Sequence, residues 1–138
     1  MTRSRSGGRA GNPTTLVSLG LLAVLAAGCG GPQSATIGRP VTLEGEVVDP
    51  QCYFTHGGRG PAHRACALLC ARGGQDLAFL NRAGGRVYPI IAARHGENPN
   101  DSLYAVVGYS VVVVGALYEK GGQKVLRVDG VKRLDRGS

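Results

Sequence analysis

Several signatures of enzymes and redox carriers are missing from this 138-residue chain. It has neither the C-x-x-C pair of thioredoxin-like proteins nor a C-x-x-C-H segment for covalent haem. No serine stands in a G-x-S-x-G turn, no phosphate-binding glycine loop is present, and no spacing pairs two carboxylates for catalysis. The sequence therefore indicates no catalytic residues, and it favours a binding or accessory module over an enzyme.

Clusters of basic residues are also missing, although the chain is basic overall. The formal net charge is +7, yet lysine and arginine never form a run of five, and aromatic residues make up only 5% of the chain. A nucleic-acid-binding surface usually combines a basic stripe with interleaved aromatic side chains. We therefore expect no nucleic-acid partner.

The apolar run from Leu16 to Ala27 is too short for a permanent membrane span, which needs roughly 20 residues. Arginines precede it without any acidic residue, which is typical of a secretory signal. The run ends in Ala-Ala-Gly-Cys and resembles the signal of bacterial lipoproteins, although Ala26 stands where that family usually has leucine. The resemblance implies cleavage after Gly28 by signal peptidase II and acylation of Cys29. The alternative is an ordinary secretory signal cut nearby, with Cys29 free or paired.

Acylation would fix both the location and one partner of the protein. Several acyl chains hold a protein on a membrane almost permanently. We expect a lipid anchor at Cys29 in the cell membrane or the outer membrane, with the protein facing the periplasm or the exterior, and with an envelope protein as a further partner. The predicted organisation is a signal peptide (1–28), a flexible tether (29–40), a barrel domain (41–134) and a disordered tail (135–138).

The domain is predicted to be mainly β, a five-stranded OB-like barrel with one short helix after the first strand. Alternating or β-branched residues predict strands at 41–49, 76–81, 86–92, 109–118 and 124–131, with a bulge or a close approach at Gly45. Pro61 to Arg72 is a predicted helix, Gln51 to Gly60 a loop, and 102–107 a short helix. The strand pattern resembles the OB-fold domains of small exported bacterial proteins. Ordinary OB domains place their helix between the third and fourth strands, so the early helix of this chain departs from that pattern.

Residue types suited to metal or redox chemistry are concentrated between Asp49 and Cys70. The stretch contains three of the four cysteines and two of the three histidines, namely Cys52, His56, His63, Cys66 and Cys70. Helical spacing would bring the last three of these onto one face. If Cys29 is acylated, an odd number of thiols remains in an oxidising compartment, which calls for an explanation.

Three interpretations of the cluster stay open. The cysteines with either histidine have the donor atoms that copper(I) or zinc prefers. Alternatively, Cys52 forms a disulfide with Cys66 or Cys70 and staples a protein-interaction module, or one thiol attacks and another resolves in redox exchange. The C-x-x-x-C spacing with a distant histidine is similar to that of Sco-type copper chaperones, but their thioredoxin-like fold is not in this sequence, so the likeness is one of chemistry only.

The segment around the cluster, D-x-x-C-Y-x-x-x-G followed by H-x-x-C-A-x-x-C, resembles uncharacterised exported bacterial proteins that supply no activity to carry over. Two further polar residues have simpler interpretations. Asp49 before Pro50 is predicted to be a turn residue, with the alternative that it orients His56 or His63. His95 is predicted to lie in a solvated loop.

Overall fold

The strands form where apolar and polar side chains alternate, most clearly from Val41 to Val47, where the odd-numbered residues turn towards the core. The computed structural model describes residues 37–134. In chain order the elements are β1 (Arg39–Val48), α1 (Pro50–His56), the 3-10 helix η1 (Pro61–His63), α2 (Arg64–Arg72), β2 (Ala78–Asn81), β3 (Val87–Ile91), β4 (Ser110–Lys120) and β5 (Gln123–Arg133). The signal, Gly28, Cys29, most of the tether and the 135–138 tail lie outside the described residues.

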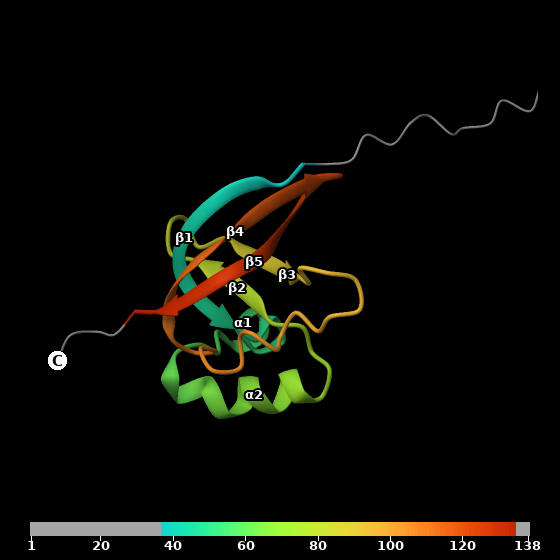
Figure 1. Ribbon diagram of the computed structural model, residues 1–138. Helices are drawn as coiled ribbons and strands as arrows, with labels where there is room; N and C mark the ends of the chain where they lie inside the picture. The colour runs from blue at the N-terminus through green and yellow to red at the C-terminus, as the bar shows by residue number, and fades with distance from the viewer. Residues whose placement is uncertain (1–36, 135–138) are drawn as a thin grey trace, which may run out of the picture. The chain divides into compact units, whose positions relative to one another are not determined.

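The five strands close into a barrel in the order β1-β2-β3-β5-β4, and β4 returns to β1 (Figure 1). All neighbours are antiparallel except β3 and β5, which run parallel. Closure gives every strand a partner on both sides, with a short parallel contact between β3 and β5 at Ile90–Leu126 and Ile91–Arg127. The predicted OB-like barrel with a short helix after the first strand is confirmed.

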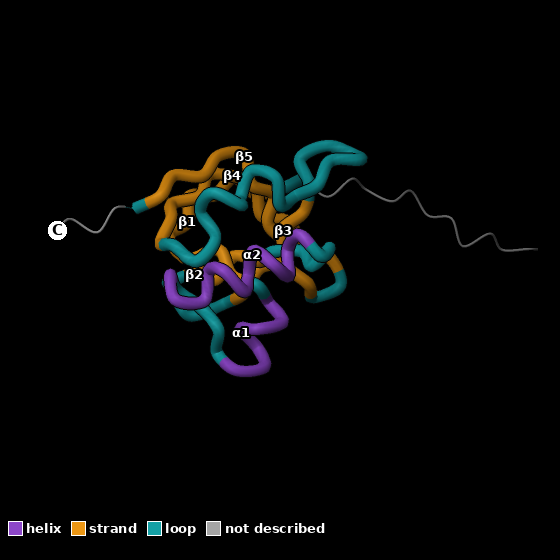
Figure 2. The backbone as a smooth tube through the Cα atoms, turned by 90° about the horizontal axis from the view of Figure 1, so that it is seen from below, coloured by secondary structure: helices purple, strands orange, loops and turns teal. Residues whose placement is uncertain are grey.

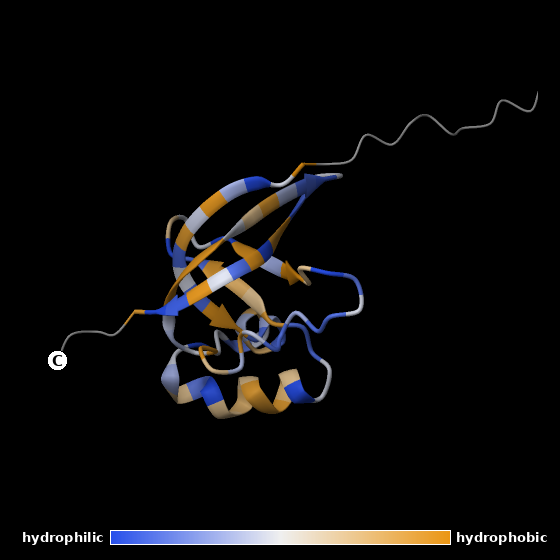
Figure 3. Ribbon diagram, viewed as in Figure 1, coloured by the Kyte–Doolittle hydropathy of each residue, from blue (hydrophilic) through white to orange (hydrophobic). Residues whose placement is uncertain are grey.

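The barrel is filled by aliphatic and aromatic side chains from all five strands, as the alternating hydropathy of β1 and β5 suggests (Figure 3). Phe79 and Val113 are fully buried at its centre. The helices cover one end of the barrel (Figures 1 and 2), where Ala67 and Ala71 of α2 pack into the same core. The barrel end and the helices therefore form one packed unit, which fixes the position of the segment from Asp49 to Cys70.

Two strand glycines allow neighbouring strands to approach closely. A Cβ at Gly45 would collide with the backbone carbonyl of Leu80, and one at Gly115 would collide with that of Arg127. Gly115 also lies at a register shift between β4 and β5. The expectation of a close approach at Gly45 is thus confirmed.

Some element boundaries differ from those predicted. The segment 51–60 is not a loop throughout, because Asp49 caps a helix that begins at Pro50 and ends at the left-handed Gly57. The helix expected over 61–72 begins with a 3-10 turn before α2. The stretch 102–107 forms successive turns rather than a helix, and β1 begins at Arg39, two residues early. Within the described part of the chain, no helix has the length and apolar character needed to cross a membrane.

Replacing Gly45 by alanine is expected to destabilise the domain by about 2 kcal/mol, because backbone cannot move away from the added methyl group as a side chain can. The matched control is Gly130→Ala in β5, where an added Cβ meets no atom within 4 Å. The control should stay within about 0.5 kcal/mol of the unsubstituted protein in urea denaturation. Equal stabilities for the two variants would contradict the packing described for β1 and β2.

Candidate metal centre

All five predicted ligands come together at the helix-covered end of the barrel. Helix α1 carries Cys52 and His56, η1 carries His63, and α2 carries Cys66 and Cys70. The three sulfur atoms lie within 4.8 Å of one another, and the Cys52 sulfur also lies within 4.8 Å of a ring nitrogen of each histidine. The sequence thus identified residues that the fold brings into contact range.

Helix α1 is fixed at both of its ends by local chemistry. Asp49 accepts a hydrogen bond from the Gln51 N–H at 2.9 Å, and Pro50 occupies the first turn, where a missing N–H has no cost. Gly57 ends the helix with φ 71° and donates its N–H to the Tyr53 carbonyl. These caps set the start of a seven-residue helix and thereby the position of Cys52, which is 6% exposed.

Helix α2 is tied to the rest of the barrel by one arginine. The guanidinium of Arg64 donates hydrogen bonds to the carbonyls of Val107 and Tyr104, at 2.6 and 3.0 Å. Glu46 of β1 accepts the Gly60 N–H just before η1. Because both contacts join the start of the helical segment to distant parts of the chain, Cys66 and Cys70 are held against α1 by tertiary structure.

The three thiols differ in their exposure to solvent. Cys66 is exposed, Cys70 is half-buried and Cys52 is buried, and all three are free cysteines. The sulfur atoms of Cys52 and Cys66 are 3.8 Å apart, well beyond a covalent bond of about 2.05 Å. The arrangement is a set of reduced thiols, two of which are close enough to bond after a small movement.

A buried carboxylate lies beneath these thiols. Asp49 is 1% exposed, and its Oδ2 has no conventional hydrogen-bond partner among the described residues. Burial alone would raise the pKa of Asp49, but interactions with the thiols of Cys52 and Cys70 and with the N–H of Gln51 outweigh burial and lower it. The same carboxylate, together with burial, raises the pKa of Cys52 to about 12 and also raises that of Cys70.

Asp49 therefore has a larger role than a turn residue, and its side chain interacts with thiols rather than orienting His56 or His63. The signal that could have identified it is the Asp-Pro pair at the start of a helix, where an N-capping carboxylate is expected.

The two histidines lie side by side, with ring centroids 5.3 Å apart and planes inclined at 64°. His56 is exposed, and its Nδ1 is 2.9 Å from the hydroxyl of Thr55. The Nε2 atom of His63 is buried without a hydrogen-bond partner in the described structure. A Cβ at Gly58 would overlap the His63 ring, so this glycine makes room for the imidazole.

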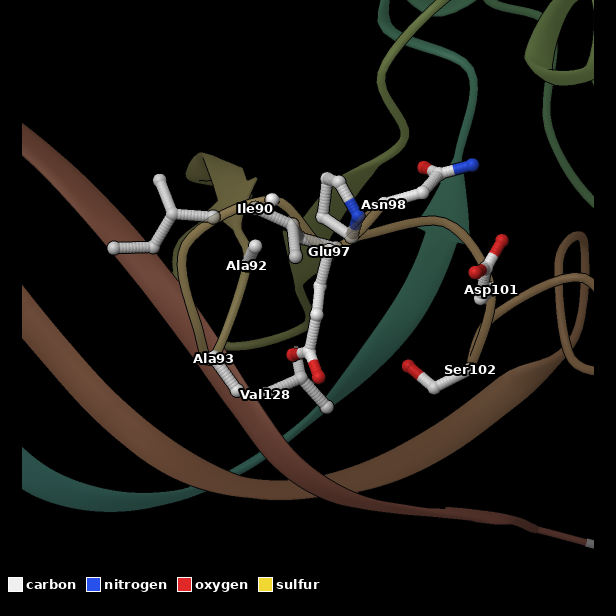
Figure 4. Close-up of a pocket in the computed structure, with 11 residues that line it drawn as sticks. Ile90, Ala92, Ala93, Glu97, Asn98, Asp101, Ser102 and Val128 are labelled. Atoms are coloured by element: carbon white, nitrogen blue, oxygen red, sulfur yellow. The ribbon is translucent and has the colours of Figure 1, made fainter.

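Other candidate regions lack this chemistry. His95 is exposed in a loop, as predicted, beside an ion pair between Arg94 and Glu97. The cavity of about 600 Å³ in Figure 4 lies between the end of β3 and the 92–102 loop, and its lining residues include neither cysteine nor histidine. We found no protein family, characterised protein or solved structure that matches this chain.

The carboxylate's effect on the thiols can be measured with Asp49→Asn, which keeps the helix cap but removes the charge. At pH 8.5 a thiol of pKa about 12 is almost entirely protonated, so Cys52 should react slowly with iodoacetamide. The variant should label Cys52 at least tenfold faster, because loss of the negative charge lowers the thiol pKa. Labelling is followed site by site by mass spectrometry.

Asp76→Asn is the matched control for this experiment, because Asp76 is exposed and lies outside the cluster. It should leave the labelling rate of Cys52 unchanged. Indistinguishable rates for Asp49→Asn and the unsubstituted chain would show that the carboxylate does not suppress ionisation of Cys52.

Proposed function

We propose that this protein is an exported lipoprotein whose barrel binds a soft metal ion, copper(I) or zinc, through Cys52, Cys66 and Cys70 with the help of His56 and His63. The observation that carries the proposal is the proximity of three free thiols, supplied by two helices, within 4.8 Å of one another. Sulfur and imidazole donors together favour these two ions over hard cations, which prefer oxygen.

The spacing of the sulfurs supports this choice. An ion bound to three thiolates at about 2.3 Å holds them about 4 Å apart in a trigonal plane. Cys52 and Cys66 are already 3.8 Å apart, and the whole trio needs a contraction of less than about 1 Å. Binding would release the thiol protons to solvent, so uptake should weaken as the pH falls.

The proposed location gives this site a role. A protein anchored through Cys29 would work at the surface of an envelope membrane, in an oxidising compartment where free thiols normally form disulfides. Metal binding would explain why thiols are kept there. Exposure of Cys66 offers an ion one accessible donor, while the buried Cys52 holds it from the inside. We propose that the bound ion is delivered to an envelope enzyme or withheld from it.

A disulfide-stapled interaction module is the second candidate. The 3.8 Å separation favours a bond between Cys52 and Cys66, which would close a loop of about 15 residues worth around 3 kcal/mol. Phe54 and Leu69 are 70% and 73% exposed on the two helices and would provide apolar contact area for a partner. Redox exchange has less support, because the raised pKa values of Cys52 and Cys70 disfavour either as the attacking thiol.

Metal analysis separates the two candidates. The full chain carrying Cys29→Ser, reconstituted without oxygen, should retain at least one equivalent of copper(I) or zinc after desalting. Cys52→Ser should lower the affinity at least 100-fold by removing the donor shared by all ligand sets, whereas His95→Ala should have no effect. If the protein retains less than a tenth of an equivalent of metal, and if the denatured unreduced protein has one free thiol, the metal site is wrong and the disulfide-stapled module is correct.

The anchor is tested independently in bacterial cells. Mass spectrometry of the purified protein should find an acylated Cys29 at the amino terminus and no residues before it. Cys29→Ala should move the protein from the membrane fraction to the soluble fraction, because the acyl chains supply the membrane affinity. An unmodified amino terminus in soluble extract would remove the lipoprotein assignment while leaving the metal site open.

A further inference from the structure

The ligands of the proposed metal site divide into two overlapping groups of three. One group is Cys52, Cys66 and Cys70, and the other is Cys52, His56 and His63. Within each group all the ligand atoms lie within 4.8 Å of one another, and Cys52 is the single residue that the groups share. The arrangement therefore differs from one site surrounded by five donors.

We propose that the cluster holds two soft metal ions bridged by the thiolate of Cys52, one bound to the three sulfurs and the other to Cys52 and the two histidines. This inference rests on the metal-binding function proposed above and concerns the number and arrangement of the ions. A thiolate sulfur keeps three lone pairs after deprotonation, so it can bind two ions at once. Each ion then has three donors, which suits copper(I) in particular.

Charge favours a second ion. Three thiolates around one copper(I) leave two negative charges uncompensated, and the buried carboxylate of Asp49 lies against the same thiols. Uncompensated charge in a buried site is costly. A second cation on the histidine side offsets part of this charge without adding another anionic donor, because imidazole binds metals in its neutral form.

The exposed histidine is oriented by its neighbour. Thr55 donates its hydroxyl hydrogen to the Gln51 carbonyl at 2.8 Å, so the same hydroxyl oxygen accepts the Nδ1–H of His56. This contact leaves the lone pair of His56 on Nε2, available to an ion. A hydrogen bond to the far nitrogen is the usual way in which proteins orient a metal-binding imidazole.

The second histidine has an unsatisfied atom. Nε2 of His63 is buried against the Gly58 backbone and has no hydrogen-bond partner among the described residues. Buried polar atoms normally have a hydrogen-bond partner. The absence of one at Nε2 of His63 therefore indicates that this imidazole binds a group that the described residues do not provide. A cation bound to Cys52 and His56 of α1 would also bind this ring, and it would thereby link α1 to η1.

The stoichiometry of copper(I) tests the inference. The full chain with Cys29→Ser is titrated without oxygen against the coloured copper(I) chelator bathocuproine disulfonate. It should withdraw two equivalents of copper, and X-ray absorption should show sulfur and nitrogen donors together. The double variant His56→Ala/His63→Ala should bind one equivalent with sulfur donors alone, and His95→Ala should still bind two.

The single variant His56→Ala guards against misfolding, because this side chain is exposed and its loss should leave the barrel intact. It should weaken the second equivalent at least tenfold and leave the first unchanged. If the chain with all five ligands intact saturates at one equivalent of copper, the bridged pair of ions is wrong, whereas binding of a single ion remains supported. Failure to retain any copper or zinc would overturn both.

Discussion

The interaction of the buried Asp49 carboxylate with the start of α1 and with the neighbouring thiols is the one on which the rest of the cluster depends. Asp49 stands between the end of β1 and the first turn of α1, where one oxygen caps the helix and the carboxylate also interacts with the thiols. A charged group that is 1% exposed is tolerated only where several donors surround it. The position therefore couples three things: where the strand stops, where the helix begins, and how readily Cys52 and Cys70 lose their protons.

The barrel gives this arrangement its rigidity. Closed pairing of β1 with both β2 and β4 fixes the end of β1, and Ala67 and Ala71 seat α2 on the same core. Arg64 and the Gly60–Glu46 hydrogen bond then hold the second helical segment against the first. Since the donors occupy rigid elements on both sides, a bound ion would meet a largely preformed site, and little ordering of the chain would accompany its uptake.

Much of the fold and the membership of the cysteine and histidine cluster followed from sequence, because both depend on local patterns. Alternation along Val41–Val47 defined a strand, and the density of cysteine and histidine after Asp49 defined the cluster. Helix α1 was missed because the glycines from Gly57 onward dominated the composition of its segment, although an Asp-Pro start was present. The division of the donors into two groups around Cys52 required the packing of α1 against α2, which no local pattern encodes.

The length of β1 has a consequence for how the site meets its surroundings. The strand runs for ten residues, from Arg39 at one rim of the barrel to Val48 at the other, where the helices lie (Figure 1). At about 3.3 Å per residue the strand is about 30 Å long, measured along its curved path. Whatever precedes Arg39 therefore joins the domain at the rim opposite the sulfurs. The residues that could bind an ion therefore lie at the end of the domain that is remote from the start of β1, and the chain that enters the barrel does not cover them.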